Sequence, residues 1–146
     1  MKVWIKRIGI AVPALAVAIQ LVPYGRAHDN PATVQEPAWD SPATRDLAVR
    51  ACFDCHSNET AWPWYTNVAP ISWLAQHDVE EGRRRLNFSE WNRTYRSARE
   101  AAETVREGEM PPPYYTVAHP SARLSAEEID QLAAGLTATL GGRSGG

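Results

Sequence analysis

The chain is poor in cysteine, methionine and excess charge, and each shortage narrows what it can do. It has two cysteines, two methionines and a formal net charge of −2 over 146 residues. Proteins that bind nucleic acid need a concentrated basic face, so this charge argues against nucleic acid as a partner. The basic triplet Arg83-Arg84-Arg85 follows Glu80 and Glu81, which predicts a solvated helix face of mixed charge.

Convincing strand signals are also missing, so we predict an all-α domain. Local signals mark the helix ends: Ser41-Pro42 as a start, Ser89 as a cap, Gly108 as a stop and Ser125 to Glu128 as a capping box. The predicted helices cover about residues 43–52, 71–85, 90–107 and 126–140. The stretches 57–70 and 110–123 are rich in proline and aromatics without a clear period, and we expect them to be irregular.

Both cysteines lie in one pentapeptide, Cys52-Phe53-Asp54-Cys55-His56. Two thiols at this spacing lie on one side of a helical turn, where they can form thioethers to the two vinyl groups of a porphyrin. A histidine directly after the second cysteine brings an imidazole to the iron as the proximal ligand. The motif therefore predicts one covalently attached haem c, with Cys52 and Cys55 as attachment points and His56 as an iron ligand.

Three other interpretations of the motif stay open. A redox dithiol is usually placed at a helix start within an alternating strand–helix pattern, which this sequence does not show. A structural zinc site would need two further ligands, and His77 or His119 would supply them only at unusual spacings. A plain disulfide is disfavoured because so short a loop constrains very little of the unfolded chain.

The distal iron ligand has two candidates. Met110 precedes three prolines, which place it on a stiff, extended segment, and Met with His is a standard c-type pair. Met1 lies in the N-terminal segment, so Met110 is the only thioether in the predicted domain. His77 is the alternative, on the helix that follows the first irregular stretch.

Aromatic residues are plentiful, with six tryptophans in the chain. A domain of this size has a small core of its own, and a covalently held porphyrin would form much of it. The residues predicted to line a haem pocket are Trp64, Tyr65, Trp73 and Trp91. The alternative is an ordinary aromatic core.

One long apolar run is present, from Ile8 to Tyr24, and Lys2, Lys6 and Arg7 precede it. The layout is that of a secretory signal, but the residues up to Ala27 make a poor cleavage site. An uncleaved anchor needs roughly 17–25 residues, which the run barely reaches. We expect a signal-anchor helix that leaves the cationic end in the cytoplasm and the remainder of the chain exported.

These observations predict four regions. Residues 1–27 form the signal-anchor or transmembrane segment, and residues 28–40 form a proline-containing linker. Residues 41–141 form the haem-binding domain, a small helical domain of c-type cytochrome kind, and residues 142–146 form a disordered tail.

The chain resembles a known family in several motifs. They are Cys-Phe-Asp-Cys-His-Ser-Asn-Glu-Thr from Cys52, Trp-Pro-Trp-Tyr at 62–65, Pro-Ile-Ser-Trp at 70–73, Leu-Asn-Phe-Ser-Glu-Trp at 86–91, Gly-Glu-Met-Pro-Pro at 108–112 and Ala-Arg-Leu-Ser at 122–125. Together they resemble the bacterial haem-binding domain family of c-type cytochrome-like envelope proteins, over about residues 28–141. The resemblance implies thioethers on Cys52 and Cys55, proximal ligation by His56, and Met110 at the Met-Pro position of cytochromes c.

The function expected from these features is electron transfer by an exported, membrane-tethered, mono-haem protein. No nucleophile–base pair is visible, so we expect an electron carrier and not an enzyme. The expected partners are redox proteins of the bacterial cell envelope and the cytoplasmic membrane. A haem-based sensor of small ligands, or a peroxidase-like protein with a labile distal ligand, is the alternative.

Overall fold

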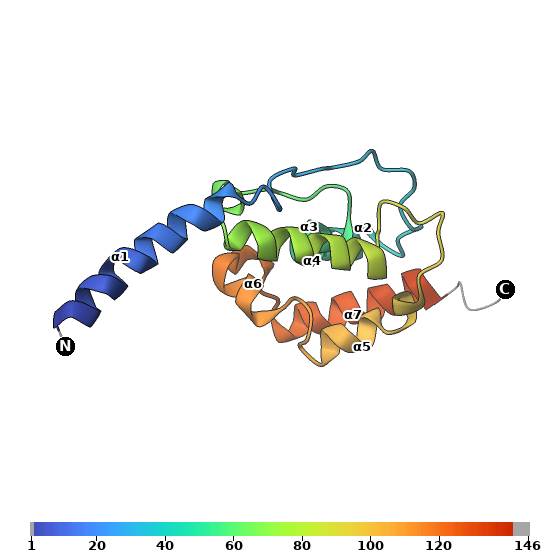
Figure 1. The fold of residues 1–146 in the computed structure, drawn as a ribbon. Helices are drawn as coiled ribbons and strands as arrows, with labels where there is room; N and C mark the ends of the chain where they lie inside the picture. Colours follow the sequence, from blue (N-terminus) through green and yellow to red (C-terminus); the bar gives the residue numbers. More distant parts are fainter. Residues whose placement is uncertain (1, 142–146) are drawn as a thin grey trace. The chain divides into compact units, whose positions relative to one another are not determined.

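The computed structural model describes residues 2–141, which divide into two compact units. Unit 1 combines residues 2–28 with 62–78, and unit 2 combines residues 29–61 with 79–141. Within the described residues the regular elements are helices, and one isolated bridge joins Gln35 to Glu90. The all-α prediction is confirmed (Figure 1).

The elements follow in a simple order along the chain. The α-helices are α1 (Lys2–Ala18), α2 (Pro42–Ala51), α3 (Phe53–His56), α4 (Ile71–Arg85), α5 (Ala101–Arg106), α6 (Pro113–Ala118) and α7 (Ala126–Leu140). The 3₁₀ turns are η1 (Ile19–Leu21), η2 (Trp64–Asn67), η3 (Arg96–Arg99) and η4 (Pro120–Ala122).

Two of the predicted helix starts are confirmed in detail. The Ser41 hydroxyl accepts a hydrogen bond from the Thr44 amide, and Pro42 occupies the first turn of α2. At α7 the Ser125 hydroxyl accepts from the Glu128 amide, and the Glu128 carboxylate accepts from the Ser125 amide at 2.8 Å. Both helices begin where local side chains satisfy backbone N–H groups that have no helical partner.

The predicted helix over 90–107 is wrong in its first half. Only α5 is a regular helix in this region, preceded by the turn η3. The Ser89 hydroxyl is not a cap, because it accepts a hydrogen bond from the Asn58 amide at 2.9 Å. The Trp91 amide donates to the Gln35 carbonyl, so residues 89–91 pair with another segment instead of starting a helix. Gly108 does end α5 in a left-handed conformation, with φ of +72°.

Helix α6 is an addition to the predicted elements, since residues 110–123 are irregular by sequence pattern. Pro112 precedes the helix and Pro113 occupies its first turn. Backbone N–H groups in the first turn have no acceptor within the helix, so the N–H that a proline lacks costs no hydrogen bond there. A run of prolines can therefore introduce a helix as well as exclude one.

The core of unit 2 lies where α2, α3, α5 and α7 meet. Helices α5 and α7 pack side by side, and α2 packs on α7 (Figure 1). The rings of Phe53 and Phe88 stack with centroids 5.6 Å apart, and Trp39 lies 5.1 Å from Phe88. Trp39 belongs to the predicted linker, residues 28–40, which from residue 29 onward is part of unit 2. This packing fixes the segment that carries both cysteines.

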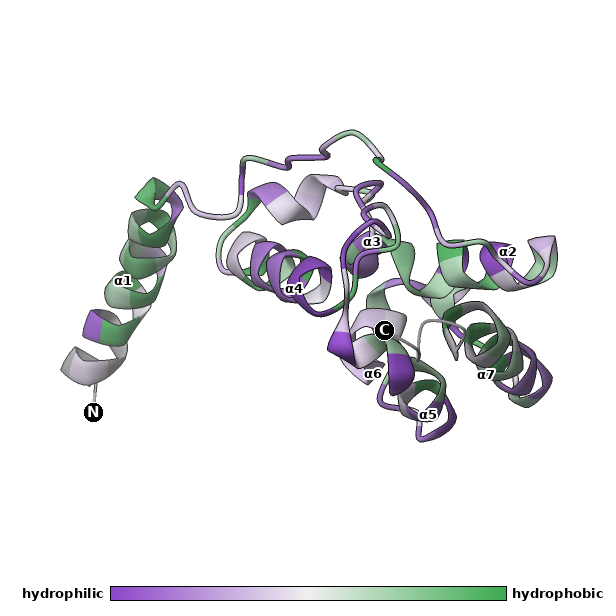
Figure 2. Cartoon of the chain, turned by 90° about the vertical axis from the view of Figure 1, so that its right-hand side faces the viewer, coloured by the Kyte–Doolittle hydropathy of each residue, from purple (hydrophilic) through white to green (hydrophobic). Residues whose placement is uncertain are grey.

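Unit 1 contains the N-terminal apolar run, and its helix is shorter than predicted. Helix α1 has 17 residues and ends at Ala18, well before Tyr24. After the turn η1 the chain is extended at Val22, because the following Pro23 disfavours helical backbone at the residue before it. Hydrophobic residues occupy most of α1 (Figure 2). Among residues 2–141, however, the structure has no helix with the length and apolar character needed to cross a membrane.

The end of the apolar run is tied into unit 1. The Gln20 side chain donates to the Ala69 carbonyl at 2.9 Å and accepts from the Ala69 amide at 3.0 Å. Gly25 has φ of +83° and lies so close to Ser72 that a Cβ on it would come within 2.1 Å of the Ser72 carbonyl oxygen. Residues 19–28 are thus an integral part of this unit.

Candidate functional site

The pentapeptide 52–56 occupies the junction between α2 and α3. Cys52 lies between the two helices, as the C-cap of α2 and the N-cap of α3, and its amide donates to the Ala48 carbonyl at 2.8 Å. The His56 amide donates to the Cys52 carbonyl at 2.9 Å, which closes one helical turn. Phe53, between the two cysteines, is 2% exposed and anchors the turn in the core. The motif therefore has the helical form that its spacing predicts.

His56 is held by backbone groups of the residues that follow α4. Its Nδ1 lies 2.9 Å from the Leu86 carbonyl oxygen, and its own carbonyl accepts from the Phe88 amide at 2.8 Å. A carbonyl only accepts, so Nδ1 carries the proton and Nε2 is the nitrogen with a free lone pair. Burial lowers the pKa of His56, although hydrogen bonds to the Leu86 and Gly82 carbonyls oppose this shift. Burial thus favours the neutral imidazole, and the hydrogen bond to the Leu86 carbonyl gives the ring one orientation, as a metal ligand requires.

Helix α4 approaches α3 very closely at one point. A Cβ built on Gly82 would lie 2.3 Å from the Cys55 carbonyl oxygen and 3.0 Å from the Cys55 Cβ. Only glycine permits this approach without displacing backbone. The same helix ends beside Leu86, so its position determines where the acceptor for His56 lies.

A pocket of about 220 Å³ brings together three of the predicted site residues. Cys52, His56 and Met110 all line it. Its lining also includes Arg85 and Glu109, two charged residues that the sequence did not predict as part of the site. The volume is below the roughly 300–1,000 Å³ usual for cofactor sites, so a porphyrin would extend beyond this pocket. The pocket thus brings together a thiol, an imidazole and a thioether, the groups that the sequence predicts for haem attachment and for the two iron ligands.

The segment that carries Met110 is tied to the motif by a hydrogen bond. The Tyr115 hydroxyl, in α6, donates to Asp54 Oδ2 at 2.5 Å. The other carboxylate oxygen of Asp54 accepts from the Ala61 amide at 2.9 Å. Sequence reasoning missed this pair, since its members are 61 residues apart and belong to no shared motif.

The chemistry of the thiols does not favour the alternative interpretations. Neither cysteine is in a disulfide, and both are partly exposed. Burial, with a smaller contribution from Cys55, raises the pKa of Cys52 to about 12, whereas reactive redox dithiols have lowered values. Within residues 2–141 no three side chains from His, Cys, Asp and Glu gather in a group that could hold a metal ion, so the zinc interpretation has no support there.

The other predicted site residues lie elsewhere. His77 is an exposed residue of α4, and Trp64, Tyr65 and Trp73 belong to unit 1 with it. Trp64 is 79% exposed, while the indole N–H of Trp73 is buried with no acceptor in the structure. Trp91 is in the core of unit 2 and lines a second cavity beside Tyr95. None of these five lines the pocket of Cys52, His56 and Met110.

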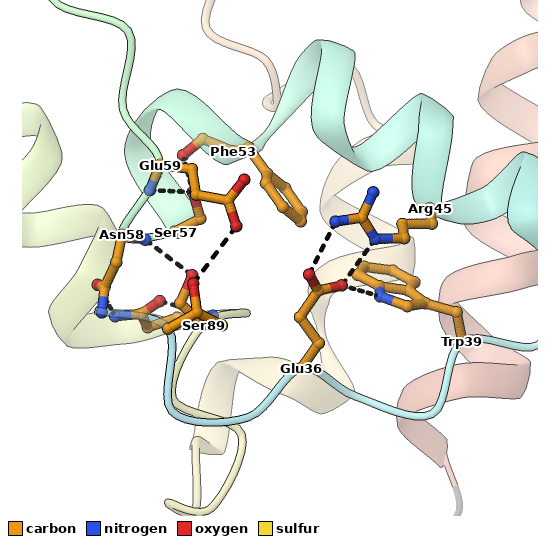
Figure 3. A network of polar contacts seen from close by, with 10 residues as sticks. Glu36, Trp39, Arg45, Phe53, Ser57, Asn58, Glu59 and Ser89 are labelled. Atoms are coloured by element: carbon orange, nitrogen blue, oxygen red, sulfur yellow. Dashed lines mark hydrogen bonds and ion pairs between the residues drawn. The ribbon is translucent and has the colours of Figure 1, made fainter. Parts of the chain in front are cut away.

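The chain after His56 is fixed by a buried polar network (Figure 3). The Ser57 hydroxyl donates to the Phe53 carbonyl at 2.8 Å and accepts from the Glu59 amide at 2.9 Å. Asn87 donates to the Asn58 side-chain oxygen at 2.8 Å, and its own oxygen accepts from the Ser89 amide. Buried groups satisfied this completely make a rigid support for the motif.

Arg83 corrects the prediction of a uniformly solvated basic triplet. Its guanidinium donates to the carbonyls of Ser57 and Asp29, at 2.7 and 2.8 Å, and to the side chains of Asn30 and Thr60, both at 2.9 Å. Its two neighbours in the triplet do pair with Glu81 at the surface, as predicted. The first arginine is therefore structural and joins three segments around the motif.

Comparison with known proteins gives one match. Residues 14–138 match the model of a family described as Haem-binding domain. No curated protein and no solved structure matches the chain. The match covers most of the chain and starts inside the apolar run, so residues 14–28 are part of the matched domain as they are part of unit 1.

Proposed function

The chain belongs to the haem-binding domain family, and from this membership we propose that it is a mono-haem c-type cytochrome-like protein that transfers electrons. Haem iron, when bound, supplies a one-electron couple whose potential depends on the axial ligands and on burial. The observation that carries the proposal is the geometry of His56: Nδ1 is committed to the Leu86 carbonyl, and the ring lines a pocket with Cys52 and Met110.

Each residue of the site has a proposed role. Cys52 and Cys55 form the thioethers, His56 supplies the proximal nitrogen and Met110 supplies the distal sulfur. The pocket favours Met110 over His77 as the distal ligand, because Met110 shares it with His56. We keep four residues as candidates for contacts with the haem: Trp64, Tyr65, Trp73 and Trp91. The buried indole N–H of Trp73 has no acceptor in the structure, so a carboxylate group of the haem would satisfy it.

We propose that the protein is located in the bacterial cell envelope, with its haem domain outside the cytoplasm and redox proteins as its partners. The N-terminal segment acts as an uncleaved export signal that associates with the cytoplasmic membrane. The hydrogen bonds between Gln20 and Ala69 support retention of this segment, since cleavage after Ala27 would remove one side of unit 1. Exposed apolar side chains of α1, such as Ile10 and Leu15, support the membrane association.

A sensor of small ligands is the second candidate function. Met110 is 37% exposed and its segment lies outside any helix, which favours a sulfur that can leave the iron. A labile distal ligand would open the position to a diatomic gas. Glu109 also lines the pocket and is a potential proton donor or acceptor there, as a peroxidase-like reaction would need.

The deciding experiment is expression with a haem-attachment system, followed by spectroscopy of wild type, Met110→Ala and His77→Ala. We expect haem that stays bound in a denaturing gel, and a near-infrared band from sulfur–iron bonding that Met110→Ala loses and His77→Ala keeps. Cys52→Ala and Cys55→Ala should each leave at most one thioether. Haem released completely on denaturation of the wild type would contradict covalent attachment. Rapid carbon monoxide binding by the reduced wild type would favour the sensor.

Location needs its own measurement. Cells that express the full chain are fractionated, and the N-terminus of the mature protein is sequenced. We expect the haem protein in the membrane fraction, beginning before Gln20. A mature protein that begins after Ala27 would contradict retention of the segment.

A further inference from the structure

The segment that carries Met110 has little of its own to hold it. Helix α6 follows it, is six residues long and contains no buried residue. Before Met110 the chain is fixed to α5, where the Glu109 and Met110 amides both reach the Thr104 carbonyl, at 3.1 and 3.4 Å. These bonds fix the backbone on one side of the sulfur only.

The other side is fixed by Tyr115. Its hydroxyl donates to Asp54 Oδ2, and its ring stacks on His119 with centroids 4.1 Å apart. His119 in turn bonds the Tyr115 carbonyl through Nδ1 at 3.0 Å. Pro111 and Pro112 restrict the backbone between Met110 and α6, so a constraint on Tyr115 is transmitted to Met110 with little slack.

Asp54 is itself immobilised by the motif. It lies between the two cysteines, its Oδ1 accepts from the Ala61 amide, and its carbonyl accepts from the Thr60 hydroxyl at 2.8 Å. A carboxylate fixed at both oxygens presents a directed, charged acceptor to the phenol. Hydrogen bonds to charged groups are about twice as strong as those between neutral groups.

We propose that the Tyr115–Asp54 hydrogen bond positions Met110 opposite His56, and so decides how firmly the distal sulfur is held. This inference rests on the proposed haem ligation by His56 and Met110. Tyr115 and Asp54 are positioning residues: neither donates an electron pair to the iron. The pair joins the segment that follows Met110 to the peptide that carries His56, so it would hold the two residues that ligate the iron in a fixed relation when haem is bound.

The test compares Tyr115→Phe with Tyr114→Phe in the haem-loaded full chain. Tyr115→Phe keeps the ring that stacks on His119 and removes only the donor, while Tyr114 lies on the same helix and is 54% exposed. We expect Tyr115→Phe to weaken the sulfur–iron band and to raise the affinity of the reduced protein for carbon monoxide by about 10-fold, which equals about 1.4 kcal/mol. Tyr114→Phe should match the wild type in both.

Asp54→Asn and the double variant assign the effect to the pair. Asn keeps an oxygen for the Ala61 amide but loses the charge. The double variant, Tyr115→Phe with Asp54→Asn, should change the sulfur–iron band and the carbon monoxide affinity no more than the more affected single variant does. A separate readout uses the haem-free protein, where hydrogen exchange in residues 113–118 should be about 10-fold faster in Tyr115→Phe than in Tyr114→Phe.

The results distinguish a failure of the proposed haem ligation from a failure of the positioning role alone. A wild type without a sulfur–iron band overturns the proposed ligation, and the positioning role with it. A normal wild-type band that Tyr115→Phe leaves unchanged overturns the positioning role alone. A lower unfolding temperature with an unchanged band and unchanged carbon monoxide affinity also overturns it, because the pair would then serve stability only.

Discussion

Gly82 and the carbonyl group of Cys55 are in direct contact, with no room for a side chain between α4 and the pentapeptide 52–56. We therefore predict that Gly82→Ala forces α4 away from α3, because a Cβ would meet backbone 2.3 Å away. Overpacking of this kind costs about 1–3 kcal/mol. Urea unfolding of the haem-free protein measures the loss, and the yield of covalent haem should fall with it. Gly141→Ala is the control, since its Cβ would meet nothing within 4 Å.

Helix α7 makes a similar approach to α2. A Cβ on Gly135 would lie 2.0 Å from Thr44 Oγ1 and 2.5 Å from its Cγ2. We expect Gly135→Ala to destabilise the protein by about 1–3 kcal/mol. The second substitution Thr44→Ala removes both atoms and should recover part of the loss. Thermal unfolding of the two single variants and the double variant tests this. A loss of stability in the double variant that equals the sum of the two single losses would show that the two sites do not interact.

Glu36 should make stability depend on pH in acid. Two hydrogen bonds and the charge of Arg45, with the Trp39 N–H at 2.7 Å, hold the pKa of Glu36 below its usual value, and burial opposes them (Figure 3). A lowered folded-state pKa gives stability that is complete above the unfolded-state value and is lost as pH falls through the folded-state value. Both side chains are partly exposed, at 24% and 38%, so we expect Glu36→Gln to cost about 1 kcal/mol at pH 7.

The difference in stability between wild type and Glu36→Gln should shrink as the pH falls below the usual pKa of a glutamate, because the stabilisation is lost as the pH falls through the lowered folded-state pKa. Unfolding curves between about pH 7 and pH 3 measure it. Glu81→Gln is the contrasting case: Arg84 and Arg85 lower the pKa of Glu81 to about 2, but the side chains of both arginines are mostly exposed, at 71% and 64%, and we expect a much smaller change in stability. A constant difference at all pH values would show that Glu36 contributes by packing alone.

Arg83 should be intolerant of lysine. A lysine has no planar fork and cannot reach the acceptors on Ser57, Asp29, Asn30 and Thr60 together. We predict that Arg83→Lys destabilises the haem-free protein by about 2 kcal/mol, while Arg84→Lys, at an exposed ion pair, changes little. Chemical unfolding compares them. Equal losses of stability from the two substitutions would show that Arg83 does not support the pentapeptide 52–56.

The thiol of Cys52 should react slowly while the protein is folded. Its pKa of about 12 leaves almost no thiolate at neutral pH, and the thiolate is the reactive form. In a Cys55→Ser variant without haem, we expect alkylation of Cys52 to be far slower in the native protein than in urea. Desolvation is the larger cause of the raised pKa, so it persists without Cys55. Rapid native alkylation would restore the redox-dithiol interpretation.

The parts of the fold that the sequence predicts are those decided by neighbours along the chain. The caps at Ser41 and Ser125 act within three residues, and the thiol–imidazole motif completes itself within one turn. Ser89 has the same local pattern as a cap, but a partner 31 residues away uses its hydroxyl instead. A cap is lost in this way whenever a distant backbone donor offers a better buried hydrogen bond.

The supports of the site are harder to predict because they use groups that every residue has. The Leu86 carbonyl, which orients His56, carries no side-chain signal at all. The bond from Tyr115 to Asp54 needs a contact between segments that have no common period. Gly82 does leave a trace: a glycine inside a helix costs stability relative to alanine, so its presence there indicates a close approach. That trace identifies a contact but not the partner.

The hydrogen bonds between Gln20 and Ala69 also bear on synthesis. Ribosomes make a chain from its N-terminus, so Gln20 is made before its partner Ala69, which follows 49 residues later. During that interval the hydrophobic residues of the run cannot make their contacts with residues 62–78, which have not yet been made. Unit 1 can close only after Cys52 and Cys55 have been made, because Ala69 follows both of them in the chain.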